Sequence, residues 1–142
     1  RMVGVIRLYD PHWLMFALAI NWVSDTAAFV GGKTMGRHKL SPRISPGKTW
    51  EGAVVSALGA VLFGVLYLGY FLPGVPLWAR IAVSLVGNVA ALFGDLAESA
   101  LKRGAGVKDS SGFLPGHGGF LDRVDGTLFS IPAIYLFLRM FR

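Results

Sequence analysis

The sequence predicts an all-α fold, a polytopic bundle of membrane-spanning helices that forms one domain over residues 1–142. Three observations carry this prediction: 54% of the 142 residues are hydrophobic, only 15% are charged, and the mean hydropathy is +0.55. An ordinary soluble domain carries about 25% charged residues. Cysteine is absent, which excludes disulfides, thiolate nucleophiles and cysteine-based metal sites.

Four apolar runs are the predicted spans, because a helix needs about 20 residues to cross the hydrocarbon of a bilayer. They are residues 12–31, 53–72, 79–97 and 127–141. The first run contains Asp25, the second carries no charge, and the third follows after a loop that permits only an antiparallel hairpin. The last run is short and contains Pro132, so we expect it to be tilted, kinked or partly inserted. Small residues that allow close helix packing are Gly59, Gly64, Ala82, Gly87, Ala90 and Gly94.

The positive charges predict the sidedness of the chain. Residues 32–48 hold five lysines and arginines and no acid, and the positive-inside rule therefore places the loop 32–52 in the cytoplasm. Two spans later the chain returns to the same side, so the loop 98–126 is also expected there. A full fourth crossing would place Arg139 and Arg142 outside, against the rule.

The carboxylates gather at the predicted cytoplasmic ends of the spans. Apart from Asp10, all of the eight acids lie there, namely Asp25, Glu51, Asp95, Glu98, Asp109, Asp122 and Asp125. A charge that faces lipid costs about 2.5 to 3.5 kcal/mol, so Asp25 and Asp95 are expected to face a polar cavity. Grouped oxygen ligands suit Mg²⁺, which binds few carboxylates together with water and substrate phosphates. In a second interpretation, which stays open, these acids only neutralise nearby lysines and arginines at the headgroup level.

Two polar segments offer groups for a phosphate ligand. Residues 114–126 are rich in glycine around His117, and glycine lets backbone N–H groups approach an anion closely. His117 is equally open to a structural hydrogen-bonding role. In residues 41–52, Thr49 is expected either to cap the following helix or to belong to a phosphate site at its N-terminus.

The segment from Ser99 to Asp125, SALKRGAGVKDSSGFLPGHGGFLDRVD, resembles the signature of phosphatidate cytidylyltransferases (CDP-diacylglycerol synthases). Every fixed position of that signature matches, and the upstream stretch DTAAFVGGKTMGRHKLSPRISPGKTWEG is also similar to the family. Members of this family are usually about twice as long. The resemblance therefore implies that residues 1–142 correspond to the C-terminal catalytic membrane domain.

The resemblance implies an integral membrane enzyme, dimeric in known cases, that condenses CTP with phosphatidic acid to give CDP-diacylglycerol and pyrophosphate. It implies a magnesium requirement, with one or two ions, and places the metal-binding acids at Asp95, Asp122 and Asp125. These three acids and Lys108 form the expected catalytic group. We expect the substrates to be held by Lys102, Arg103, Arg123, His117 and Ser99, with Lys48 and Lys33 as weaker candidates. The enzyme is expected in a prokaryotic inner membrane with its active site facing the cytoplasm, and its anionic partners are nucleotide and lipid rather than nucleic acid.

Three other functions compete with this interpretation. A CTP-dependent lipid kinase acting on a polyprenol would use similar groups but transfer the γ-phosphoryl group. A CDP-alcohol phosphotransferase is suggested by the DxxDG of residues 122–126, but no acid follows among residues 127–142, as that family requires. A cation transporter would place Asp25 and Asp95 along a conduction path, and CTP would then have no effect on it.

Overall fold

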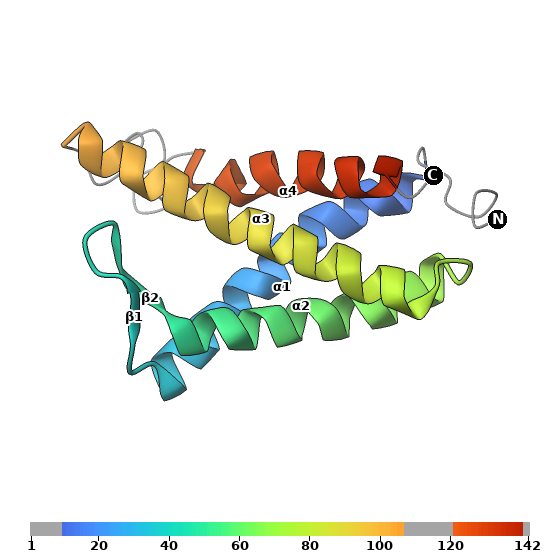
Figure 1. Cartoon of the computed structure of the whole chain (residues 1–142), viewed down its shortest axis with the longest axis horizontal. Helices are drawn as coiled ribbons and strands as arrows, with labels where there is room; N and C mark the ends of the chain where they lie inside the picture. Colours follow the sequence, from blue (N-terminus) through green and yellow to red (C-terminus); the bar gives the residue numbers. More distant parts are fainter. Residues whose placement is uncertain (1–9, 107–120, 141–142) are drawn as a thin grey trace.

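The computed structural model describes residues 10–106 and 121–140, with residues 121–125 described by their backbone alone. Four helices dominate this part of the chain, α1 (Pro11–Met35), α2 (Trp50–Phe71), α3 (Leu77–Gly104) and α4 (Leu121–Met140). A two-stranded antiparallel hairpin of β1 (Lys39–Ser41) and β2 (Ser45–Thr49) joins α1 to α2. Successive helices run in opposite directions along the long axis (Figure 1). The all-α fold class is therefore confirmed.

The hairpin is a feature that the sequence analysis missed. The sequence analysis placed these residues within the loop 32–52. Instead Pro42 lies in the turn and Pro46 lies in β2. A two-stranded ribbon tolerates proline at positions whose N–H is not needed for the ladder, and the irregular register between Lys39 and Ser41 is consistent with this exception.

Local sequence accounts for where the first two helices begin. Asp10 is the N-cap of α1, where its carboxylate accepts a hydrogen bond from the backbone N–H of His12 at 3.0 Å, and Pro11 suits the first helical position. Thr49 caps α2 by accepting from the backbone N–H of Gly52 at 3.1 Å. The expected cap at Thr49 is thus confirmed. Gly52 has no side chain with which to complete a reciprocal capping box.

Small residues let the helices approach closely, as the sequence predicts. A side chain at Gly64 of α2 would overlap the hydroxyl oxygen of Ser84 in α3. A Cβ at Gly59 would lie 3.0 Å from the Cβ of Ala27 in α1, and one at Gly87 would lie 3.1 Å from the Cδ1 of Ile134 in α4. Backbones that approach this closely gain van der Waals contact, which drives helix association where lipid removes the hydrophobic term.

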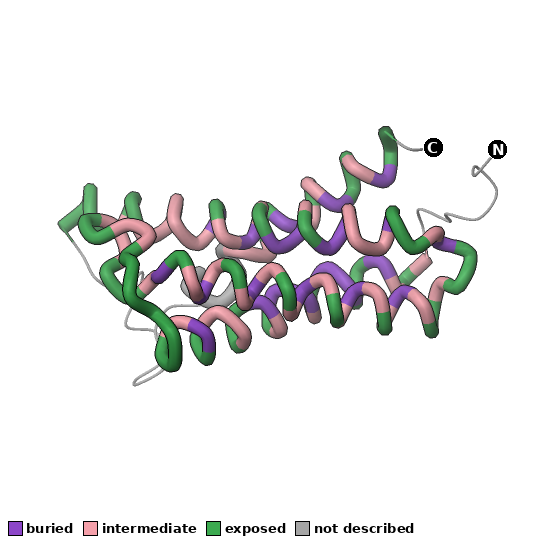
Figure 2. The backbone as a smooth tube through the Cα atoms, turned by 60° about the horizontal axis from the view of Figure 1, so that its bottom comes forward, coloured by how far each residue is buried: buried purple, intermediate pink, exposed green. Residues whose placement is uncertain are grey.

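The core is an apolar cluster at the end of the bundle away from the hairpin. Its members include Phe16, Ile20, Leu68, Val83 and Ile134, each at most 3% exposed. In Figure 2 buried positions alternate with exposed ones along the helices. The exposed positions of α2 are themselves apolar and recur every fourth residue: Val54, Leu58, Leu62, Leu66 and Tyr70. Such a surface suits lipid rather than water.

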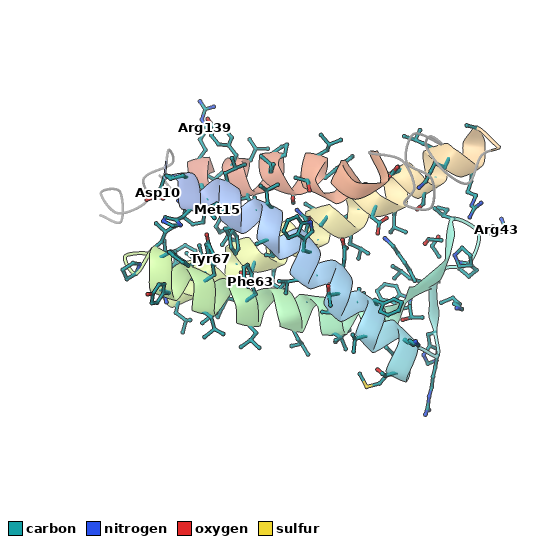
Figure 3. The ribbon with its side chains drawn as sticks, turned by 180° about the vertical axis from the view of Figure 1, so that it is seen from behind. Asp10, Met15, Arg43, Phe63, Tyr67 and Arg139 are labelled. Carbon is teal, nitrogen blue, oxygen red and sulfur yellow. The ribbon has the colours of Figure 1, made fainter. Side chains whose placement is uncertain are left out.

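Three of the helices that the structure describes are long and apolar enough to cross a membrane, namely α1, α2 and α3. In α4 the apolar stretch Gly126–Met140 is shorter, in agreement with the weaker fourth run of the sequence, and Pro132 lies inside that helix. The chain is therefore an integral membrane protein. The hairpin, the end of α3 and the start of α4 gather at one end of the bundle (Figure 1). Figure 3 shows Arg43 at this end, with Asp10 and Arg139 at the opposite one.

Candidate functional site

A pocket of about 280 Å³ opens beneath the hairpin, between α1, α2 and α3. Its walls are mostly small or apolar, and its polar lining includes Ser24, Asp25, Lys48, Thr49, Asn88 and Asp95. Leu40 and Gly47 of the hairpin complete one wall. The pocket therefore brings together residues from five elements, α1, β1, β2, α2 and α3.

An ion pair between Lys48 and Asp95 crosses this pocket. Lys48 is the penultimate residue of β2 and Asp95 lies on α3, and the Lys48 Nζ contacts Asp95 Oδ2. The Lys48 side chain is 21% exposed and its Nζ is shielded from solvent. A shielded ammonium needs an anionic partner because losing water is costly for a charge. The pair therefore ties the hairpin to α3.

A three-helix hydrogen-bond junction lines the inner part of the pocket. The Nδ2 of Asn88 donates to Ser24 Oγ at 2.9 Å and to Ser56 Oγ at 2.6 Å, and all three residues are buried. The bonds join α3 to α1 and α2. Ser56 and Asn88 were missed as site residues. The signal was available, because a polar side chain inside an apolar span is costly and therefore marks a partner or a cavity.

Two of the predicted carboxylates engage partners outside the Lys48–Asp95 pair. Glu51, in the first turn of α2, lies 2.6 Å from the ring nitrogen Nδ1 of His38 and accepts from the backbone N–H of His38 at 3.2 Å. These contacts fasten the hairpin to α2. Glu98 lies 3.6 Å from the ammonium of Lys102, one helical turn along α3. Local charge neutralisation, the second interpretation of the acidic cluster, therefore describes part of it.

The other predicted site residues divide by whether the structure describes them. Ser99 and Lys102 are partly buried near the end of α3, while Arg103 is exposed there. Lys33 is exposed at the end of α1, with its Nζ 5.7 Å from the centre of the Phe29 ring. Lys108, Asp109 and His117 lie outside the described residues, as do the side chains of Asp122, Arg123 and Asp125.

The backbone of α4 nevertheless places its first turns beside α3. Gly126 lies against Ala91 and Asn21, where an added Cβ would come within 3.5 Å and 3.3 Å of them. Ala91 lies one helical turn before Asp95 on the same face of α3. Residues 121–125 are helical in their backbone, although the sequence analysis placed them in the loop 98–126. Asp122 and Asp125 therefore stand three residues apart on one helix.

The acids of the pocket are too few to enclose a magnesium ion by themselves, but they are enough to supply part of its ligands. Among the side chains that the structure describes, residues 10–106 and 126–140, there is no group of three or more histidines and acids able to hold a metal ion. Two carboxylates, Asp25 and Asp95, do line the same pocket. Magnesium commonly takes one or two protein carboxylates and fills its shell with water and substrate phosphates. The donor set suits an ion that arrives with a phosphate ligand rather than one held by an all-protein cage.

Comparison with known proteins identifies relatives of the chain. Residues 6–141 match the cytidylyltransferase family. A phosphatidate cytidylyltransferase of Staphylococcus aureus is 43% identical over 142 residues, which cover 96% of this chain and 54% of the relative. Proteins of the same name are 37% identical in Staphylococcus saprophyticus, over 96% of this chain and 54% of the relative, and 43% identical in Brucella suis, over 90% and 47%. The chain spans about half the length of these relatives. Since the match extends over nearly the whole sequence, the chain belongs to the cytidylyltransferase family.

Proposed function

We propose that this chain carries the catalytic part of a phosphatidate cytidylyltransferase, which converts CTP and phosphatidic acid into CDP-diacylglycerol and pyrophosphate. The observation that carries the proposal is the 37 to 43% identity to proteins of that name over 90% or more of the chain. A pocket with paired cation and carboxylate at one end of an apolar bundle supports it, since a nucleotide from water must meet the head group of a lipid there.

The reaction forms one bond and breaks one bond. A phosphate oxygen of phosphatidic acid attacks the α-phosphorus of CTP, and the bond from that phosphorus to the bridging oxygen of the β-phosphate breaks. Pyrophosphate leaves with the electron pair. A phosphomonoester is already anionic at neutral pH, so alignment and charge neutralisation are needed more than a strong base.

We assign metal-binding and phosphate-binding roles to residues by their charge and their position in the structure or the sequence. Asp95, together with Asp122 and Asp125, would hold magnesium, which neutralises phosphate charge when bound. Lys48, Lys102 and Arg103 are the described cations for phosphate oxygens. Lys108 and Arg123 are further cations for this role, and His117 and Ser99 are substrate contacts. Lysine and arginine serve here as charge and hydrogen-bond donors that keep the two substrates in line.

We also propose where the site stands in the cell. Lys33, Arg37, Lys39 and Arg43 are exposed at the hairpin end of the bundle, and the positive-inside rule then puts this end in the cytoplasm of a prokaryotic inner membrane. Soluble CTP is available on that side. A homodimer, which the family resemblance implies, belongs to the same proposal.

The test is pyrophosphate release by the purified protein in detergent with CTP, Mg²⁺ and phosphatidic acid. Release that requires all three components, and that fails when ATP replaces CTP, is the expected result. Mass spectrometry of the products separates the competing lipid kinase, because a kinase yields CDP and a phosphorylated lipid without pyrophosphate. CDP formation from CTP and a polyprenol would overturn the proposal.

A negative result needs one more measurement because the chain spans about half of its relatives. The same assay is then repeated with a protein of the relatives' full length that contains these 142 residues. Absence of pyrophosphate release there as well would exclude the cytidylyltransferase.

A further inference from the structure

We propose that Lys48 is an exchangeable counter-ion of Asp95, which it leaves for a substrate phosphate when Asp95 takes a divalent cation. The inference rests on the proposed function for the identity of the phosphate ligand. The sequence analysis gave Lys48 only as a weaker candidate for binding substrate. The proposal adds Asp95 as its partner in the absence of ligand and an exchange of that partner for phosphate when ligand binds.

The placement of Lys48 gives the first step of the argument. Its Nζ is shielded from solvent and contacts Asp95 Oδ2 across the pocket. Lys48 lies near the end of β2, next to Thr49 at the cap of α2, and it lines the same pocket as Asp95 of α3. The side chain therefore reaches into the space where a ligand would lie.

Charge gives the second step. A carboxylate neutralised by an ammonium has less attraction for a divalent cation. Two cations in contact with one carboxylate also repel each other. A shielded ammonium without an anion is also unfavourable. The cation alone therefore binds weakly to Asp95, because it must displace Lys48 and leave that ammonium without its partner.

A nucleotide that binds together with its cation removes both unfavourable terms, the repulsion between the two cations and the ammonium without an anion. The cation replaces Lys48 at Asp95, while the phosphate oxygens of the nucleotide replace Asp95 at Lys48. The two partners thus exchange with no net loss of charge pairs. Coupling of this kind is reciprocal, so cation and nucleotide each strengthen the binding of the other, and an empty pocket keeps its charges paired.

The first experiment measures Mn²⁺ binding by electron paramagnetic resonance in the absence of nucleotide, with Mn²⁺ in place of Mg²⁺. The variant Lys48→Met is expected to bind Mn²⁺ about tenfold or more tightly than the wild type, and Lys48→Arg close to the wild type. The matched control is Lys39→Met, which removes the same charge from an exposed position of the same hairpin and is expected to leave the affinity unchanged. Asp95→Asn combined with Lys48→Met should abolish the gain.

Unchanged or weaker Mn²⁺ binding in Lys48→Met would overturn the proposal, as would an equal gain in Lys39→Met, which would show a general charge effect. The wild type alone provides a second measurement that does not depend on a variant folding. Acylation of individual lysines is followed by mass spectrometry, with the rate at Lys48 compared with that at Lys39.

Mg²⁺ alone at high concentration is expected to increase the acylation of Lys48 relative to Lys39, and Mg²⁺ with CTP to suppress it. No response of Lys48 to Mg²⁺ would overturn the exchange. Neither readout uses turnover, so failure of the exchange and failure of the cytidylyltransferase reaction are separable: the pyrophosphate assay on the wild type decides the second.

Discussion

At the scale of single residues, the polar groups of this protein are organised by desolvation. Asn88 satisfies two serines from other helices, and Asn21 donates to Ser130 of α4 at 2.8 Å. Within a membrane such bonds cannot be replaced by water. The same reasoning explains why Lys48 is held against Asp95, and it makes each of these residues sensitive to substitution.

We predict that Asp122→Asn lowers turnover in the pyrophosphate assay by about 100-fold or more without unfolding the protein. An amide oxygen is a far weaker ligand for magnesium than a carboxylate, so the developing charge on the phosphates loses its counter-charge. Asp10→Asn is the control, because Asp10 lies at the opposite end of the bundle (Figure 3) and asparagine also caps helices well. Turnover near the wild-type value in Asp122→Asn, with a normal gel-filtration profile, would remove this residue from the metal site.

We predict that Asn88→Leu lowers the free energy of unfolding by about 1 to 2 kcal/mol, since hydrogen bonds between membrane helices contribute about 0.6 to 1.7 kcal/mol each. The measurement is the thermal midpoint in detergent, followed by tryptophan fluorescence. Val89→Leu, at the exposed neighbouring position, is the control and should leave the midpoint unchanged. Equal midpoints for both variants would mean that the Asn88 junction contributes nothing to stability.

At the scale of elements, the hairpin and the α2–α3 pair determine the shape of the pocket. The hairpin is fastened twice, by Glu51 to His38 and by Lys48 to Asp95. The turn after α2 is fastened by Arg80, whose Nε donates to the Val75 carbonyl at 2.7 Å. The two hairpin contacts lie at the end of the bundle that holds the pocket, whereas the Arg80 contact holds the turn at the opposite end.

The close approach of α2 and α3 at Gly64 yields a prediction for the pair. Gly64→Leu forces a side chain into the space of Ser84, and overpacking of this kind costs about 1 to 3 kcal/mol. We expect a lower thermal midpoint and a lower yield of folded protein. The matched variant is Gly104→Leu, where an added Cβ meets no atom within 4 Å. A midpoint for Gly64→Leu equal to that of Gly104→Leu would show that the two helices separate at little cost.

At the scale of the whole molecule, the alternation of the helices puts the basic hairpin and the start of α4 at one end of the bundle (Figure 1). The opposite end holds the α2–α3 turn. From the positive-inside rule we expect the end with the basic hairpin to face the cytoplasm.

The absence of cysteine makes this orientation directly measurable. Pro42→Cys at the hairpin and Gly74→Cys in the α2–α3 turn are both at exposed positions. In intact bacterial cells a membrane-impermeant maleimide should label Gly74→Cys and spare Pro42→Cys, and inverted vesicles should give the opposite pattern. Labelling of Pro42→Cys in intact cells would reverse the proposed sidedness.

The sequence by itself determined the class of fold, the three strong spans, the weaker fourth run and the family, because hydropathy and a dense signature are local properties of the chain. It also indicated Thr49 as a cap and Gly64 as a site of close packing. Only the tertiary structure decided that Lys48 meets Asp95, that Asn88 joins Ser24 and Ser56, and that Glu51 binds His38 instead of the pocket. Each of these pairs is separated by between 13 and 64 residues. Such pairings depend on which helix faces meet, and the apolar periodicity of a buried membrane helix leaves those faces undetermined.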